Sequence, residues 1–410
     1  MTFESERSLP RNVWVLTAVS FLTDVSSEMI VHLLPIFLAS VLGVGTALIG
    51  LIEGVADTTT SLLKVASGWL SDRIRRRKAL AVAGYGLSTL AKPFLYFASS
   101  WAWVLGVRVA ERLGKGIRTA PRDALIAGSV DPARRGWAFG WHRAGDTGGA
   151  VVGIGLAIAL LTSGSGGGGD LGRQAFQRVV LVSLIPAVMA VILLAVAAHE
   201  IAPPAADGTS RRGLRPGLAR GFRYYLAVVV VFTLGNSSDA FLILRARSVG
   251  LSVIGVLGMM LMFNLVYALL AGPAGALSDR IGRRRLLTAG WGVYALVYLG
   301  FAWMNAVWHA WVLMAVYGVY YALTEGVGRA FVADLVRAEA HGTAFGAYHA
   351  AIGLAALPAS LMAGILWQGV GAWPGFGPAA PFFVGGVLAL AAILLLTRVP
   401  QPSAGASLGR

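Results

Sequence analysis

The stretch GWLSDRIRRRK occupies residues Gly68 to Lys78, and GALSDRIGRRR occupies residues Gly275 to Arg285. The two stretches begin at positions 68 and 275, 207 residues apart, which is about half of the 410-residue chain. Each one joins two apolar runs through a single aspartate and a group of arginines. A duplication of this kind predicts a chain made of two similar halves that have the same orientation.

The composition is typical of a membrane protein. Hydrophobic residues make up 57% of the chain and charged residues only 13%, whereas charged residues make up about a quarter of an ordinary soluble domain. The mean hydropathy is +0.71. Apolar runs of about 20 residues, long enough to cross a bilayer, recur along the whole sequence. We therefore expect a membrane-embedded chain without a large soluble domain.

Charge and residue usage exclude several other classes of protein. The net charge is +15, but the arginines lie in short connectors between apolar runs, which indicates membrane topology and not a nucleic-acid partner. The chain has no cysteine and only six histidines without metal-ligand spacing, so we expect no disulfide, no metal site and no cofactor. Asp24 and Glu28 in the first apolar run argue against a cleaved signal peptide.

Hydropathy predicts an all-α protein with twelve transmembrane helices. Those of the first half are expected at Val13 to Leu42, Leu48 to Leu70, Ala79 to Ala98, Trp101 to Thr119, Trp137 to Leu161 and Val179 to Ala198. Those of the second half are expected at Tyr225 to Leu244, Val253 to Leu277, Leu286 to Met304, Trp308 to Val332, Ala344 to Trp367 and Pro381 to Leu396.

The connectors predict the orientation and the domain limits. Arginine-rich connectors alternate with nearly uncharged ones, so by the positive-inside rule both termini and both basic motifs face the cytoplasm of an inner (plasma) membrane. The prolines and arginines of residues 201–222 indicate a cytoplasmic linker between an amino-terminal six-helix bundle, residues 1–200, and a carboxy-terminal one, residues 223–410. The glycine-rich run at 163–172 is expected to be a flexible outward loop.

Two further pairs of segments repeat at nearly the same offset. FLTDVSSE at Phe21 to Glu28 resembles FTLGNSSD at Phe232 to Asp239, and RGWAFG at Arg135 to Gly140 resembles HGTAFG at His341 to Gly346. Each pair lies on the same predicted helix of its half. We therefore expect a pseudo-two-fold axis along the membrane normal.

These features resemble the major facilitator superfamily (MFS) of secondary transporters over essentially the whole chain. GWLSDRIRRRK is similar to the motif that this family has between helices 2 and 3, except that Arg75 stands where the family usually has glycine. The resemblance implies two six-helix bundles that rock around a central site. It also implies a gate at Gly68, Asp72, Arg73, Arg76, Gly275, Asp279 and Arg280, in which Asp72 meets the helix beginning near Gly342 and Asp279 the helix beginning near Gly136. The alternative is that the arginines only bind anionic lipid and set topology.

Ionisable residues at membrane depth are the candidate substrate-binding or proton-coupling residues, because each costs about 2.5 to 3.5 kcal/mol to insert at mid-bilayer. Several share one helix face at i, i+4 spacing. The candidates are Asp24, Glu28, His32, Glu53, Asp57, Arg112, His142, Arg143, Asp146, Asp239, Asn264, Glu325 and Arg329. In a low-dielectric cavity a carboxyl group binds a proton more readily, which suits proton coupling. The alternative is static ion pairs between helices. Lys92, nearer a helix end, is expected to snorkel.

The fourth predicted helix is unusually basic. Arg108, Glu111, Arg112, Lys115, Arg118 and Arg122 share one broad face. Arg112 and Gly116 resemble the family's helix 4 motif, whose arginine is implicated in proton coupling, with Glu111 and Asp57 as candidate counter-ions. The same arginines could instead bind an anionic substrate.

The glycines of the fifth helix bear on direction. Gly140, Gly149 and Gly153 keep the spacing of the family's exporter signature, although Ile154 replaces its proline. We expect a transporter, not an enzyme, that exports a small polar or amphipathic solute by proton-coupled alternating access, functions as a monomer and has lipid and solute as its partners. Proton-coupled uptake of an organic anion is the main alternative. A membrane-embedded enzyme or sensor would need a clustered nucleophile and base, and the sequence offers none.

Overall fold

A chain that crosses a bilayer must satisfy its backbone hydrogen bonds internally, which favours helices. The structure is a computed structural model that describes residues 10–74, 76–130, 135–163, 171–201, 220–336 and 341–399. Within these ranges it is helical apart from turns, short connectors and one isolated β-bridge between Val370 and Trp373. The helices are α1 (Arg11–Val31), α2 (Leu34–Ile36), the π-helical η1 (Phe37–Val41), α3 (Thr46–Ile74), α4 (Arg77–Ala91), the 3-10 helix η2 (Lys92–Phe97), α5 (Trp101–Gly128), α6 (Arg135–Ser163), α7 (Arg173–Ala197), α8 (Arg220–Gly235), α9 (Ala240–Ser248), α10 (Val253–Ile281), α11 (Arg283–Trp303), α12 (Val307–Leu335), α13 (His341–Gln368) and α14 (Ala380–Leu396).

The prediction of twelve membrane-crossing segments is confirmed in the described part of the chain. Eight segments are both long and apolar enough to cross a bilayer; one of them joins α1, α2 and η1, and another joins α8 and α9. Four further segments complete the twelve. Two are α3 and α5, which carry many charged residues, and two are shorter, namely α4 continued by η2, and α14.

The duplication is visible in the helix bounds. Helices α3 and α10 are both 29 residues long and begin at Thr46 and Val253, 207 positions apart. Helices α5 and α12 begin at Trp101 and Val307, which are 206 positions apart. The two halves therefore repeat the same order of helices at a nearly constant offset.

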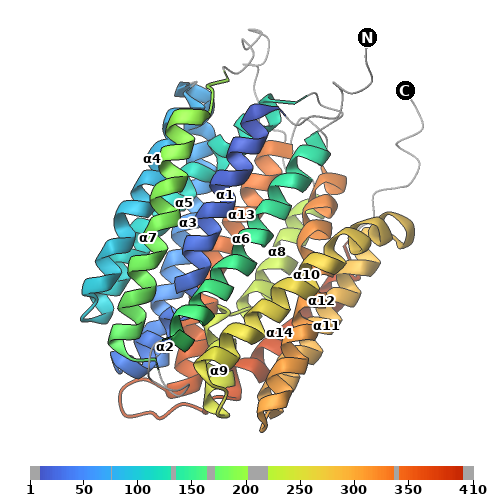
Figure 1. Ribbon diagram of the computed structural model, residues 1–410. Coiled ribbons are helices and arrows are strands. Elements are labelled where there is room, and N and C mark those ends of the chain that lie inside the picture. Colours follow the sequence, from blue (N-terminus) through green and yellow to red (C-terminus); the bar gives the residue numbers. More distant parts are fainter. Residues whose placement is uncertain are drawn as a thin grey trace.

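The helices pack in two groups that follow the two halves of the chain. In the first group α1 packs along α6 and α7, and α5 packs along α3 and α4. In the second group α12 packs along α10 and α11, and α14 packs along α8 and α11. The groups meet where α3 lies against α13 and α6 lies against α10 (Figure 1).

The two groups are joined tightly at the end of the molecule that carries α2 and α9, the lower end in Figure 1. The backbone amide of Thr46 donates to the side-chain oxygen of Gln368 at 2.6 Å, which links the start of α3 to the end of α13. A Cβ at Gly50 of α3 would lie 2.2 Å from the carbonyl oxygen of Ser360 in α13. Glycine at this position is what lets the two helices approach so closely.

Three predicted helices are interrupted. The one expected at Tyr225 to Leu244 is broken between α8 and α9, and the one expected at Val13 to Leu42 is broken at His32 and Leu33. The helix expected at Ala79 to Ala98 ends as α4 at Ala91 and continues as η2, which contains Pro93. Proline lacks the amide hydrogen that the α-helical ladder needs, which explains the change of helix type at η2.

Several boundaries predicted from hydropathy differ from the observed ones, among them the end of α5 at Gly128 and the starts of α7 and α8. Helix α7 begins at Arg173 and not near Val179, because the side chains of Arg173 and Gln177 donate to the carbonyl oxygens of Ala98 and Tyr96 at 2.6 and 2.8 Å. Helix α8 begins at Arg220, so the last three residues of the linker predicted at 201–222 are helical. Residues 202–219 of that linker and 164–170 of the glycine-rich loop lie outside the described residues.

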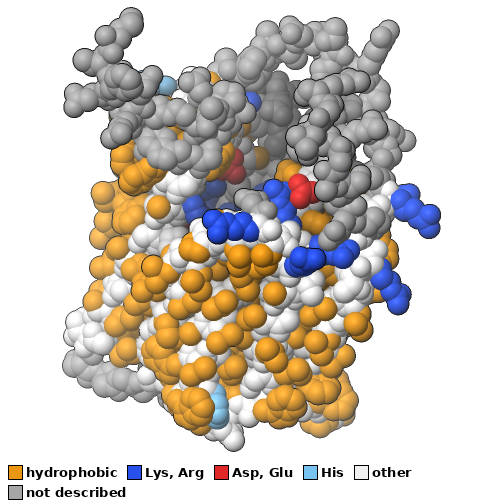
Figure 2. Space-filling model, turned by 90° about the vertical axis from the view of Figure 1, so that its right-hand side faces the viewer, with side chains coloured by type: hydrophobic (Ala, Val, Ile, Leu, Met, Phe, Trp, Pro, Cys, Tyr) orange, Lys and Arg blue, Asp and Glu red, His pale blue; other side chains and the backbone are white. Residues whose placement is uncertain are grey.

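The outer surface agrees with a membrane environment. Figure 2 shows a broad hydrophobic face below, and Lys and Arg side chains gathered in the upper part around a hollow that holds acidic groups. Leucines such as Leu269, Leu296 and Leu394 project from this outer surface. The molecule is therefore apolar where lipid tails would contact it and basic toward one end.

Candidate functional site

A cavity of about 330 Å³ lies between the two groups of helices and has a mostly polar wall. Its charged lining residues are Asp57 and Lys64 of α3, Arg112 and Lys115 of α5, and Asp239, which precedes α9. We call it the central cavity. It brings together charges from both halves of the chain, as expected for a substrate site between two bundles.

The break between α8 and α9 forms one wall of the central cavity. Residues Asn236 to Asp239 are not helical and all four line the cavity. A polar side chain satisfies part of the freed backbone, because the amide of Ser238 donates to the hydroxyl of Ser360 at 3.2 Å. Non-helical backbone at membrane depth is tolerated where it lines a cavity in this way.

Asp57 and Arg112 form the ion pair that faces the central cavity. The guanidinium of Arg112 lies 3.6 Å from Asp57 Oδ1. This geometry agrees with Asp57 as the counter-ion of Arg112. Lys64 and Lys115 line the same cavity and form no ion pair with a described residue, so its charge balance is basic.

Asp239 faces Asp57 from the opposite half of the chain. Its carboxylate accepts a hydrogen bond of 2.9 Å from the hydroxyl of Tyr317 on α12. Asn264 lies 207 positions after Asp57, the offset of the repeat, and is therefore its second-half equivalent. It does not line the central cavity; its side chain donates to the carbonyl oxygen of Met260 in its own helix at 3.0 Å. The duplication therefore places a carboxylate only at the first of these two equivalent positions.

Glu53 and Glu111 lie inside the first group of helices and not in the central cavity. Arg108 lies 2.8 Å from Glu53 and 3.0 Å from Glu111, and the side chains of Arg108 and Glu53 are only 3% and 7% exposed. The expectation of Glu111 as a counter-ion of Arg112 is thus corrected, because Glu111 contacts Arg108 one turn earlier. Arg108 and the two glutamates thus form a static cluster of ion pairs, of the kind that joins helices.

Lys92 does not snorkel. Its side chain is buried, and its ammonium donates to the hydroxyls of Ser26 and Ser27 on α1 at 2.5 and 3.1 Å. The prediction failed because two serine hydroxyls of α1 offer hydrogen-bond acceptors to the ammonium inside the first group. A polar chamber of about 110 Å³ lies inside the first group. Its lining residues include Lys92, Glu28, Arg108 and Arg118.

The predicted i, i+4 pairs are close in space. Glu28 and His32 are 2.8 Å apart, although His32 already belongs to the break after α1. His142 and Asp146 of α6 are 3.6 Å apart. Asp24, on the same helix as Glu28, forms no ion pair among the described residues. Glu28 lines the polar chamber of the first group, and His142 and Asp146 line a separate cavity of about 380 Å³.

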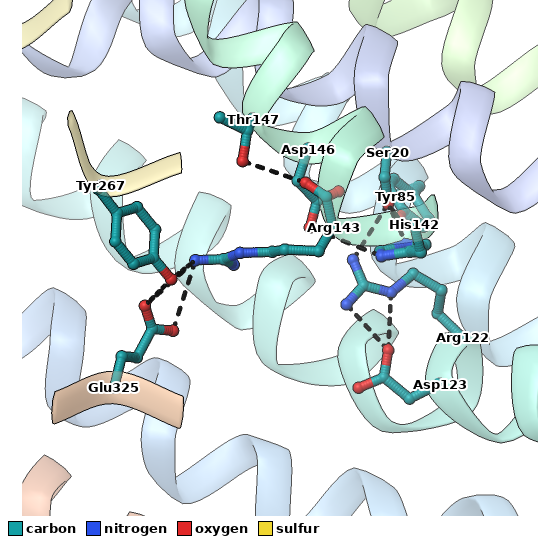
Figure 3. A network of polar contacts seen from close by, with 10 residues as sticks. All are labelled: Ser20, Tyr85, Arg122, Asp123, His142, Arg143, Asp146, Thr147, Tyr267 and Glu325. Atoms are coloured by element: carbon teal, nitrogen blue, oxygen red, sulfur yellow. Dashed lines mark hydrogen bonds and ion pairs between the residues drawn. The ribbon is translucent and has the colours of Figure 1, made fainter. Parts of the chain in front are cut away.

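A second polar network joins the two groups across a cavity of about 380 Å³ (Figure 3). Arg143 of α6 donates to the hydroxyl of Tyr267 on α10 at 2.7 Å and to Glu325 on α12 at 3.2 Å. Glu325 also accepts from Tyr267 and pairs with Arg329 at 2.8 Å. Sequence analysis named Arg143, Glu325 and Arg329 but not the tyrosine that connects them.

On the first-group side of this cavity, His142 joins a hydrogen-bonded set. Its Nε2 lies 2.8 Å from the hydroxyl of Ser20, which also accepts from Arg122 at 3.1 Å. Arg122 pairs with Asp123 at 2.9 Å (Figure 3). His142 therefore links α6 to α1 and also lines this cavity, and its role in proton coupling stays a prediction.

The predicted gate is described only in part. The side-chain environments of Gly68, Asp72, Arg73 and Asp279 lie outside what the structure describes. Arg76 and Arg280 are exposed. Gly275 lines the 380 Å³ cavity, and a Cβ there would meet no atom within 4 Å, so it makes no close helix contact in this conformation. The gate stays a prediction.

The glycines of α6 have a packing role. A Cβ at Gly149 or Gly153 would lie 2.4 or 2.5 Å from a carbonyl oxygen of α1, at Phe21 and Val25. These two glycines let α6 lie directly on α1. Their spacing is therefore explained without reference to the direction of transport, while Gly140 meets no neighbour.

Aromatic residues line a further cavity that sequence analysis missed. It measures about 310 Å³, lies within the second group of helices and adjoins the central cavity through Lys64, Thr233, Asn236 and Tyr321, which line both. We call it the aromatic chamber. Its rings are those of Tyr225, Phe232, Trp291, Tyr320, Tyr321 and Tyr348, together with the imidazole of His349. The spacing of Tyr317, Tyr320 and Tyr321 on one helix face was the signal that could have indicated it.

Comparison with known proteins agrees with this geometry. The family model described as Major Facilitator Superfamily matches residues 16–259 and 224–410. The chain belongs to the major facilitator superfamily. An uncharacterised MFS-type transporter of Methanocaldococcus jannaschii is 36% identical over 399 residues, with 96% of each chain covered. The protein is a multi-pass membrane transporter and not an enzyme.

Solved structures share the fold at low sequence identity. The nucleoside transporter NupG has a TM-score of 0.73 at 12% identity, covering 94% of this chain and 98% of that one. A D-xylose–proton symporter has a TM-score of 0.75 at 16% identity, covering 96% and 98%. At such identities the similarity extends to the fold, with two six-helix bundles, and not to the solute.

Proposed function

We propose that this MFS protein moves a small polar or amphipathic solute by proton-coupled alternating access, with the central cavity as the solute site. The observation that carries the proposal is the Asp57–Arg112 pair, 3.6 Å apart, facing the cavity opposite Asp239. A carboxylate that releases its arginine can take up a proton, and protonation removes the attraction that holds the pair together. Solute and proton binding are thereby coupled at one place.

The contacts between the two groups support alternating access. At the end that carries α2 and α9, α3 and α13 are in tight contact through Thr46, Gly50 and Gln368. Toward the other end, Gly275 and Arg143 line a cavity between the groups. In this proposal residues 1–200 and 223–410 move as two bodies of a monomer around the central cavity. The basic connectors and both termini face the cytoplasm of the inner (plasma) membrane.

The test uses the purified protein in liposomes that enclose a pH-sensitive dye. Solutes are added one at a time from a panel of sugars, nucleosides, organic acids and amphipathic amines; the first two are included because structural neighbours are a nucleoside transporter and a D-xylose–proton symporter. We expect one solute to produce a dye response that Asp57→Asn abolishes and the matched surface variant Asp334→Asn retains. Solute movement that ignores the pH gradient and is unchanged in Asp57→Asn would contradict the coupling.

The direction of transport can be measured in the same liposomes. Export is proposed only from the resemblance to the family's exporter signature, since packing also explains the glycine spacing of α6. An exporter in the inside-out orientation should accumulate solute in the lumen when the lumen is the acidic side. An importer in the right-side-out orientation should instead accumulate solute when the outside is acidic. Orientation is read by protease access to the linker between the two halves.

The basic charge of the central cavity favours a second candidate, proton-coupled uptake of an organic anion. Lys64, Arg112 and Lys115 line the cavity against Asp57 and Asp239, and guanidinium and ammonium groups match carboxylate or phosphate. Uptake that is confined to anionic solutes and lost in Arg112→Gln, but not in Arg283→Gln, would favour this candidate over export.

A further inference from the structure

The aromatic chamber has the dimensions and walls of a site for a flat ring. The chamber has a volume of about 310 Å³ and is lined by Phe232, Trp291 and Tyr320. These three side chains are buried in the protein. Phe232 and Trp291 are stacked, with ring centroids 4.3 Å apart and planes 11° apart. Such a pair holds its faces in a fixed orientation. A planar ligand can add to a stack of this kind with little reorganisation.

A second pair of nearly parallel rings lines the chamber. The rings of Tyr225 and Tyr348 lie within 5° of parallel at 6.4 Å. Tyr225 packs edge-on against Phe331 at 5.0 Å, which fixes its orientation from behind. Aromatic rings from helices α8, α11, α12 and α13 thus all contribute to the lining of the chamber.

Two of the three Lys, Arg and acidic side chains that line the chamber are basic. Lys64 and Arg329 line it together with Glu325, and Glu325 is already paired with both Arg143 and Arg329. Lys64 forms no ion pair with a described residue and also lines the central cavity, next to Arg112 and Lys115. A cationic ligand would be attracted by the ring faces but repelled by these side chains, whereas an anion would meet an unpaired ammonium.

From this juxtaposition we infer that the transported solute is an organic anion with a planar aromatic ring, whose ring enters the aromatic chamber and whose carboxylate contacts Lys64. The inference rests on the proposed function in one respect, that the central cavity is the solute site. It adds the chemical class of the solute. It also makes Trp291 and Phe232 specificity-determining residues, and Lys64 the residue that selects charge.

The experiment measures binding by calorimetry to the full-length protein in detergent. The probe is 3-phenylpropionate, compared with hexanoate (no ring), 3-phenylpropanol (no charge) and 2-phenylethylamine (opposite charge). We expect 3-phenylpropionate to bind most tightly. Trp291→Leu keeps an apolar side chain but removes the π face, and should weaken binding of 3-phenylpropionate by about fivefold while leaving hexanoate unchanged. Trp308→Leu, on the outer surface at 62% exposure, is the matched control.

The role of Lys64 in selecting charge is tested with Lys64→Met. The control is Lys78→Met, because Lys78 lies at the start of α4 and does not line the chamber. Lys64→Met should remove the preference for 3-phenylpropionate over 3-phenylpropanol, and Lys78→Met should keep it. If Trp291→Leu does not fold, Phe232→Leu replaces it, because it removes the partner of the same stack.

The outcomes separate this inference from the proposed function. Tight, Trp291-dependent binding of 3-phenylpropionate without proton movement in liposomes supports the ring site and contradicts the proton coupling. Proton-coupled transport of another solute, with no binding of 3-phenylpropionate, overturns the ring site alone. Equal binding of hexanoate and 3-phenylpropionate, or tighter binding of 2-phenylethylamine, also overturns it.

Discussion

The guanidinium of Arg143 on α6 lies 3.2 Å from the carboxylate of Glu325 on α12, although the two residues are 182 positions apart in the chain. This ion pair joins the two halves of the transporter across a cavity (Figure 3). Its side chains are 52% and 33% exposed, and exposed ion pairs contribute only about 0 to 1 kcal/mol. The pair can therefore bias the relative position of the halves without preventing their movement.

We predict that Arg143→Gln lets the halves separate further at this cavity. The chain has no native cysteine, so cysteines introduced at Phe139 and Ala271, which line opposite walls of the cavity, can carry spin labels without background. The population of molecules with the longer distance between the two spin labels should grow by up to about fivefold, since the ion pair contributes at most about 1 kcal/mol. Arg283→Gln, which removes a pair within the second half, serves as the control. An unchanged distance distribution in both Arg143→Gln and Glu325→Gln would refute the bridge.

Gly50→Ala should prevent tight closure at the opposite end. The added methyl group would lie 2.2 Å from the carbonyl oxygen of Ser360, and overpacking of this kind costs about 1 to 3 kcal/mol. Cross-linking between cysteines at positions 46 and 368 should fall markedly. The matched change Gly86→Ala on α4 meets no atom within 4 Å and should leave cross-linking intact. Equal cross-linking in the two variants would mean that α3 and α13 do not need this close approach.

Arg108→Ala should destabilise the first half strongly. It leaves the buried carboxylates of Glu53 and Glu111 without their common partner, and breaking a buried pair from one side costs about 3 to 5 kcal/mol. The free energy of unfolding is measured in mixed micelles with increasing denaturing detergent. The triple change Arg108→Met, Glu53→Gln, Glu111→Gln should recover most of the loss, because no charge is then left unpaired. A loss below about 1 kcal/mol for Arg108→Ala, the size expected of an exposed pair, would show that water reaches this triad.

Lys92 should resist chemical labelling in the folded protein. Its ammonium is buried and donates to Ser26 and Ser27, whereas Lys78 lies at the start of α4, where its side chain is partly exposed. A water-soluble amine-acylating reagent followed by mass spectrometry should modify Lys78 and spare Lys92. After unfolding, both should react. Equal modification of the two lysines before unfolding would restore the snorkelling hypothesis.

The sequence alone was sufficient for the all-α architecture and its twofold repeat. A bilayer demands about 20 apolar residues per crossing, so hydropathy counts helices well, and the copies of the basic motif aligned α3 with α10. Contacts within one helix were equally accessible, because i, i+4 spacing puts two side chains on one face. Glu28 with His32 and Glu325 with Arg329 are of this kind.

Contacts between helices were decided by the tertiary structure. Arg108 of α5 pairs with Glu53 of α3, Lys92 turns inward to Ser26, and Tyr267 connects Arg143 to Glu325. Spacing along a chain says which side chains share a helix face, but not how two helices are rotated and offset when they pack. The break at Asn236 to Asp239 and the aromatic chamber depend on that packing as well, since both require partners from several helices. Local helix geometry therefore determined the elements and their charged stripes, and only the packing of helices from both halves decided which charges face the central cavity.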